Sequence, residues 1–112
     1  MHPALTTLAT LIGFLGTAAL ASGPTPGLAR PTQVLSQTVE QMPRGARQQV
    51  QVLTATFKPG DRTVFHTHRS PVTVYVLEGR FTLELEGMPS VEVGPGQAYV
   101  EPPNVKMTGY NR

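Results

Sequence analysis

Cysteine is absent from this 112-residue sequence. Without a thiol the chain can form no disulfide, no thiolate metal site and no catalytic cysteine, and no lipid can be attached through cysteine. Charge of either sign is sparse, with 9 Lys and Arg against 7 Asp and Glu. There is no basic run or aromatic-interleaved stripe of the kind that nucleic-acid binding needs, so we expect no nucleic-acid partner.

The motifs of several large enzyme classes are also missing. The sequence has no P-loop, no G-x-S-x-G nucleophile motif and no Rossmann glycine pattern. It has room for one small domain, and its 11 glycines and 11 prolines indicate many turns. Together with runs of β-branched residues, these turns predict an all-β domain.

A long apolar run, residues 4–20, lies near the N-terminus. It leads into Ala19-Leu20-Ala21, which matches the small-x-small rule for signal-peptidase cleavage. We interpret residues 1–21 as a signal peptide, so the mature protein would be periplasmic or secreted, with no membrane attachment after cleavage. The alternative is an uncleaved anchor, but the run is shorter than the roughly 20 residues that a membrane span needs.

The rest of the chain divides in two by composition. Residues 22–47 are predicted to form a linker and N-terminal arm, because they are first rich in Gly, Pro, Ser and Thr and then show no clear period. Residues 48–112 are predicted to form the folded domain. Gln48–Phe57 alternates as a strand does, and Lys58–Asp61 has the composition of a turn.

His66 and His68 are the most informative pair of residues. Thr63–His68 is predicted to be a short strand, in which residues two apart point to the same face, so both imidazoles should project together. Neutral imidazole is the commonest protein ligand of divalent metals. The pair therefore predicts half of a metal-coordination shell.

Short strands separated by turns fill the rest of the domain. Val72–Leu77 and Arg80–Glu86 should form a hairpin, and strict alternation in the second arm marks a sheet with one buried and one exposed face. Three more strands are expected at Val91–Val93, Gln97–Val100 and Val105–Tyr110. So many short strands predict an antiparallel barrel or jelly roll.

Two motifs in this region give the chain a resemblance to a known family. The pattern G-x5-H-x-H-x3,4-E-x6-G is matched at Gly60, His66, His68 and Gly79, and the pattern G-x5-P-x-G-x2-H-x3-N at Gly96, Pro102 and Asn111. The chain thus resembles the cupins, which are small jelly-roll β-barrels, from Gln48 to Arg112. Asn104 stands at the second glycine of the later motif and tolerates a left-handed backbone almost as well.

The resemblance implies an altered metal site. Metal-binding cupins hold one ion with two histidines and a glutamate from the first motif and a histidine from the second. Here His66 and His68 are retained, but the glutamate position holds Val72, or Thr73 with the longer spacing, and the second-motif histidine is Met107. The implied ligands are therefore His66, His68 and Met107.

Two imidazoles and a thioether would favour copper, tolerate zinc and suit manganese or iron less well, since these prefer a carboxylate. The cofactor expected is therefore a copper, zinc, iron or manganese ion. The alternative is that Met107 is an apolar filler of the barrel mouth. His66 and His68 would then bind water or a small-molecule ligand.

Other side chains near the pair have two interpretations each. Glu101 could lie at the barrel rim near the histidines, but a solvated rim charge is the simpler interpretation. Tyr75 and Tyr99 could line the cavity or pack with their hydroxyls at the surface. Arg62 and Arg69 could meet an anionic ligand or be ordinary surface residues.

Cupin barrels usually continue past the second-motif asparagine, whereas this sequence ends at Arg112. We therefore expect an antiparallel jelly-roll barrel that lacks its last strand. Thr32–Gln37 or a partner subunit in a homodimer would cover the open edge, because a bare sheet edge invites pairing. A clipped chain is the remaining alternative.

The function expected is that of an exported barrel protein that binds a metal ion or a small molecule through His66 and His68, with no defined catalysis. The alternative is a metal-dependent oxygenase or isomerase of the cupin type with an incomplete ligand set. Whether the chain is an enzyme is left open, because this fold hosts unrelated activities.

Overall fold

The computed structural model describes Gly13, Gly16, Gly23 and residues 26–112. The predicted signal peptide, residues 1–21, lies outside the described residues apart from two glycines. Within the part of the chain that is described, no helix is long and apolar enough to cross a bilayer. Residues Pro31–Arg112 form one compact unit, to which all the strands belong.

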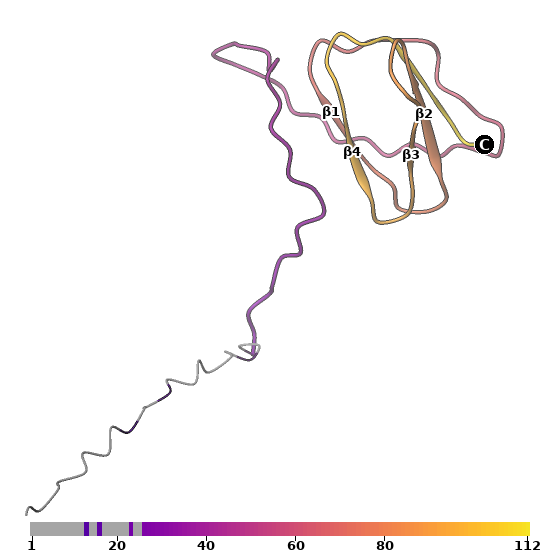
Figure 1. The fold of residues 1–112 in the computed structure, drawn as a ribbon. Helices are drawn as coiled ribbons and strands as arrows, with labels where there is room; N and C mark the ends of the chain where they lie inside the picture. The colour runs from indigo at the N-terminus through magenta and orange to yellow at the C-terminus, as the bar shows by residue number, and fades with distance from the viewer. Residues whose placement is uncertain (1–12, 14–15, 17–22, 24–25) are drawn as a thin grey trace, which may run out of the picture. The chain divides into compact units, whose positions relative to one another are not determined.

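Five short strands, all paired antiparallel, build this unit (Figure 1). β1 pairs with β4 in one sheet, and β2 lies between β3 and β5 in the other. No helix occurs among the described residues, so the predicted all-β, antiparallel fold is confirmed. The strands are β1 (Val72–Tyr75), β2 (Phe81–Leu85), β3 (Val91–Val93), β4 (Ala98–Glu101) and β5 (Met107–Tyr110).

The hydrophobic core lies on one face of the three-stranded sheet. Leu83 and Leu85 are buried, whereas Glu84 between them is exposed, as the alternation predicted. Met107 lies opposite Leu85 and completes the cluster. Each such side chain contributes about 1.5–3 kcal/mol when fully buried. A slip of one residue would expose this whole set, so burial fixes the register of β2 and β5.

The predicted hairpin between Val72–Leu77 and Arg80–Glu86 is wrong. β1 pairs with β4, with Val74 opposite Tyr99, whereas β2 pairs with β3 and β5. Gly79 does turn the chain, with a φ of 74° that glycine adopts at little cost, but the turn leads from one sheet to the other. Turn chemistry marks where a strand ends, while the partner strand is selected by which faces can be buried together.

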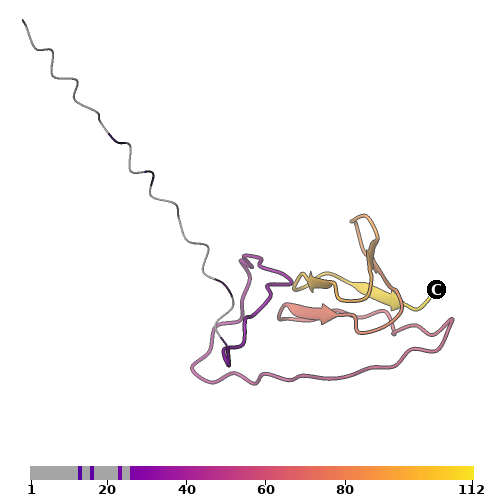
Figure 2. The same ribbon diagram turned by 90° about the horizontal axis from the view of Figure 1, so that it is seen from below.

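The strand predicted at Gln48–Phe57 is also absent. The segment runs extended along the domain (Figure 2), and Val50 and Val52 are 90% and 91% exposed. Alternating β-branched residues supply strand propensity, but a strand exists only where a partner takes its backbone hydrogen bonds. No described strand pairs with this segment. Its end is held against the domain, where the ring of Phe57 lies 5.4 Å from that of Phe81.

The histidine segment pairs with β5 at two isolated positions instead of forming the continuous strand that was predicted. Arg62 lies opposite Tyr110, and His66 lies opposite Met107. Arg62 and His66 are four positions apart in the histidine segment, whereas their partners Tyr110 and Met107 are three positions apart in β5. The histidine segment therefore carries one extra residue between the two pairs, as in a β-bulge. The bulge brings the backbone carbonyl of Val64 against the ring of His66.

Candidate metal centre

The imidazoles of His66 and His68 lie together on the inner side of their segment. Both residues are half-buried, whereas Thr67 between them is exposed, so the two rings share a face as expected. Their Nε2 atoms are 3.1 Å apart, and the rings meet edge-on. Two tetrahedral nitrogen ligands at about 2.0–2.1 Å from zinc lie about 3.3 Å from each other. The observed spacing therefore fits two donors to a single ion.

The bulge fixes the orientation of the His66 ring. Its Nδ1 lies 2.5 Å from the carbonyl oxygen of Val64. Because a carbonyl can only accept, Nδ1 carries the hydrogen and the Nε2 lone pair faces His68. Metal-ligating histidines commonly donate their other ring N–H to a backbone carbonyl in this way. His66 is thus held in the tautomer that a metal ligand needs, and the contact between the rings is a hydrogen bond donated by His68.

Glu101 is a third group of the site, and its interpretation as a solvated rim charge is wrong. It ends β4, is only 5% exposed, and its Oε2 lies 3.5 Å from Nε2 of His68. Sequence reasoning underrated it because a carboxylate next to Pro102 gives no hint of what lies across the sheet. The available signal was an acidic residue that directly follows a short apolar run, residues 98–100.

Burial sets the charge states in this cluster. It raises the pKa of the Glu101 carboxyl, while positive charge on His66 acts in the opposite direction. It lowers the pKa of His68, and repulsion from His66 lowers it further. His68 therefore favours its neutral form. His66 acts on Glu101 only while it is protonated, and its neutral form is the one whose Nε2 lone pair is free. Burial also raises the pKa of Tyr99, with a smaller contribution from the charge of Glu101.

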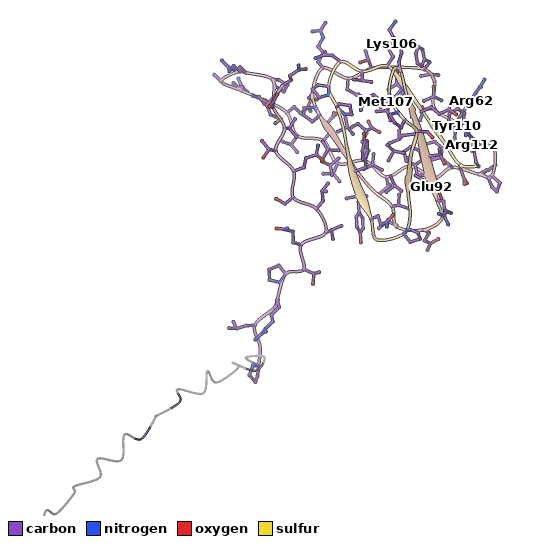
Figure 3. The ribbon with its side chains drawn as sticks, viewed as in Figure 1. Arg62, Glu92, Lys106, Met107, Tyr110 and Arg112 are labelled. Carbon is purple, nitrogen blue, oxygen red and sulfur yellow. The ribbon has the colours of Figure 1, made fainter. Side chains whose placement is uncertain are left out.

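Met107, labelled in Figure 3, is fully buried. It packs with Leu83 and Leu85, as an apolar filler would. Its backbone also exchanges two hydrogen bonds with His66, at 3.0 and 2.8 Å, and residues directly opposed in this way project to the same face. The thioether therefore lies on the histidine side of the sheet, and its role as a ligand stays a prediction.

Two asparagines of the second motif anchor the loops around the site. Asn104 has a φ of 62°, which confirms the left-handed backbone expected there, and its N–H donates to the carbonyl of His68 at 2.7 Å. The side-chain amide of Asn111 donates to the carbonyl of Phe57 at 2.8 Å, and its backbone N–H donates to Asp61 at 3.0 Å. These bonds hold the start and the end of the histidine segment against the body of the domain.

The other four candidate residues differ in how exposed they are and in which side of the sheet they occupy. Arg62 and Arg69 are exposed, as ordinary surface arginines are. Tyr75 is half-exposed, whereas Tyr99 is half-buried and lies two residues before Glu101 in β4. Residues two apart in a strand share a face, so of these four only Tyr99 lies on the side of β4 that meets the histidines.

Two open hollows lie elsewhere on the unit Pro31–Arg112. One, of about 300 Å³, is lined mainly by β3 and β4, and the other, of about 490 Å³, lies between arm residues 35–42 and the residues Pro71, Thr73 and Val100. Neither has His66 or His68 on its wall. They therefore give no support to a small-molecule cavity at the histidine pair.

Within residues 26–112 and the three described glycines before them, no group of three or more His, Cys, Asp or Glu side chains is arranged to hold a metal ion. As the side chains stand, the two histidines are the pair whose spacing suits a shared ion.

A family model described as "Cupin domain" matches residues 53–112, more than half of the chain. No curated protein and no solved structure matches the chain. The matched region holds all five strands, both histidines and the carboxylate beside them.

Proposed function

Because this chain belongs to the cupin domain family, we propose that it is an exported protein that binds a metal ion through His66 and His68, with no defined catalysis. The observation that carries the proposal is the pair of Nε2 atoms 3.1 Å apart, one of them held in the ligand tautomer by the carbonyl of Val64. Export rests on the signal-peptide pattern of residues 1–21.

Each histidine has a distinct part in this function. His66 is ready to bind, since its Nε2 lone pair already faces the site. His68 binds once its hydrogen moves from Nε2 to Nδ1, because the ligand is the nitrogen lone pair. Burial favours neutral His68, and only neutral imidazole coordinates. A bound ion would supply Lewis-acid polarisation of whatever occupies its remaining positions.

The enzyme alternative differs from this proposal in one measurable property. A metal-dependent oxygenase needs a redox-active ion held at one per chain, whereas a binding protein needs only reversible occupancy. Two histidines alone leave most coordination positions open to water or to a ligand. Because so few protein ligands hold an ion only weakly, the site favours reversible binding over a permanently held catalytic metal.

The test is metal content and metal titration on the purified chain. We expect up to one equivalent of zinc, copper, iron or manganese by elemental analysis, and its loss in the His66→Ala/His68→Ala double variant. Thr67→Ala is the matched control, because Thr67 lies between the histidines and is exposed; it should bind as the parent chain does. A folded chain that binds none of the four metals at micromolar concentration would overturn the proposal.

A further inference from the structure

The carboxylate of Glu101 lies where the first motif would have placed one. Of the two residues that could occupy the glutamate position of that motif, Val72 and Thr73, only Val72 is followed by Gly79 at the spacing of the motif. In the β1–β4 ladder Val72 and Glu101 are direct partners. Side chains directly opposed in an antiparallel pair project to the same face, with their Cβ atoms about 4.5–5.5 Å apart. A carboxylate carried by position 101 can therefore reach the same space as one carried by position 72.

The surroundings of Glu101 indicate a site rather than a structural ion pair. Among the described residues the one basic side chain within 4 Å of its carboxylate is His68, at 3.5 Å, which favours its neutral form. The side chain of Glu101 is only 7% exposed. A buried carboxylate is costly unless it is paired or coordinates a metal. An apolar residue at this place would be cheaper for folding, so the carboxylate needs another reason to be there.

A valine at position 72 is compatible with a carboxylate at position 101. Two opposed carboxylates would repel each other at close range, so only one of the two positions can carry the charge comfortably. The small side chain of Val72, half-buried beside Glu101, leaves room for the longer one opposite. A carboxylate on β4 at position 101 therefore lies next to the place on β1 that holds Val72.

We infer that Glu101 is the third ligand of the metal held by His66 and His68, supplied from β4 in place of the carboxylate that β1 lacks. This inference rests on the proposed function. As the side chains stand, the three described residues do not form a metal-binding group, so the inference requires the Glu101 carboxylate, 3.5 Å from Nε2 of His68, to turn towards both imidazoles when an ion binds. Two imidazoles and a carboxylate form a harder donor set than two imidazoles and a thioether. The site then suits zinc, iron or manganese rather than copper.

The experiment measures Zn²⁺ binding to the full chain by calorimetry, for the parent and for Glu101→Gln. Glutamine keeps the size and loses the charge, so we expect affinity to fall at least about tenfold. Glu78→Gln is the matched control, because Glu78 is exposed in the turn after β1, and it should bind as the parent does. Circular dichroism shows that each variant is folded.

A second variant tests directly whether β1 can supply the carboxylate instead. In Val72→Glu/Glu101→Val the carboxylate is on β1, and we expect zinc affinity within a few-fold of the parent and well above that of Glu101→Gln. If Glu101→Gln binds zinc as tightly as the parent while the double histidine variant does not bind, the inference about Glu101 is overturned and the proposed function stands. If the parent binds copper but no zinc, iron or manganese, the inference about Glu101 is overturned and the proposed function stands. If the parent binds none of the four metals, both are overturned.

Discussion

His66 and Met107 are direct partners, joined by two backbone hydrogen bonds of 3.0 and 2.8 Å. The pair brings the first histidine of one motif beside the position that holds a histidine in the other. A hydrogen-bonded antiparallel pair has its Cα atoms about 5.5 Å apart, and an imidazole at position 107 could span that distance to an ion at His66. Substitutions at position 107 therefore test whether this position faces an ion held by His66.

We predict that Met107→His tightens Zn²⁺ binding by at least about tenfold, because it adds a nitrogen ligand to the two histidines. Met107→Leu, which keeps the apolar volume, is the control: it should bind zinc as the parent does if the thioether only fills the core. Calorimetric titration measures both. No gain from histidine in a folded variant would show that position 107 does not face the ion, and a loss with leucine would make the thioether a ligand.

The next prediction concerns Gly109, whose backbone lies against the ring of Phe81. A Cβ at position 109 would clash with Cζ of the Phe81 ring, so the ring covers the backbone of β5. Gly109→Ala should therefore destabilise the fold by about 1–3 kcal/mol, as overpacking of a core does, and urea denaturation measures it. The matched control is Gly45→Ala, where the nearest atom is 3.5 Å from the added Cβ. Equal stability of the two variants would contradict this account of the packing.

Local features of this fold could be predicted from the sequence. The alternation of Phe81–Leu85 identified the buried face of β2 correctly, because burial requires a period of two. Asn104 was correctly assigned a left-handed backbone, since few residues other than glycine adopt it. The strand at Val91–Val93 was also found where β-branched residues lie between turns.

Features that depend on strand pairing could not be predicted. The alternation of Gln48–Phe57 indicates a strand, but the pattern cannot say that no partner is present. The place of Glu101 was missed for the same reason: its neighbours Val72 and His68 lie far from it in sequence, and only the register of β1 with β4 brings them together. The shared orientation of His66 and His68 could be predicted, because it depends on the backbone of only three consecutive residues.

The pair Glu84 and Arg112 supplies a test of the surface electrostatics. The hydrogen bond from the Arg112 guanidinium, which also lies over the ring of Tyr110 (Figure 3), lowers the pKa of Glu84 below its ordinary value of 4.5. A pKa lowered in the folded state means that the pair stabilises the fold above pH 4.5 and that this contribution is lost as pH falls through the folded pKa. Because both groups are exposed, the effect on stability should be small.

NMR titration of the Glu84 carboxyl measures that shift directly. We expect a midpoint below 4.5 in the parent chain and a higher midpoint in Arg112→Gln. Arg80→Gln is the control, because Arg80 pairs with Glu92 instead and should leave the Glu84 midpoint unchanged. Equal midpoints in the parent and Arg112→Gln would show that the pair does not persist in solution.

Homodimerisation through an edge strand stays a prediction, and the extended segment Gln48–Phe57 offers a test of it. Val50 and Val52 are almost fully exposed, and an extended stretch with free backbone groups pairs readily with another chain. We expect a mass that rises towards that of a dimer with concentration, measured by light scattering. Val52→Pro should abolish this rise, since proline cannot donate to a ladder but is compatible with an extended, unpaired backbone.

Val52→Thr is the matched variant, because it keeps both the backbone N–H and the β-branched shape while replacing one methyl group with a hydroxyl. If dimerisation depends on backbone pairing, the threonine variant should dimerise nearly as the parent does, whereas the proline variant stays monomeric. If it depends on apolar contact alone, threonine should weaken it as well. A parent chain that remains monomeric at every concentration would rule out this segment as a dimer interface, and the exposed valines would then have no role in self-association.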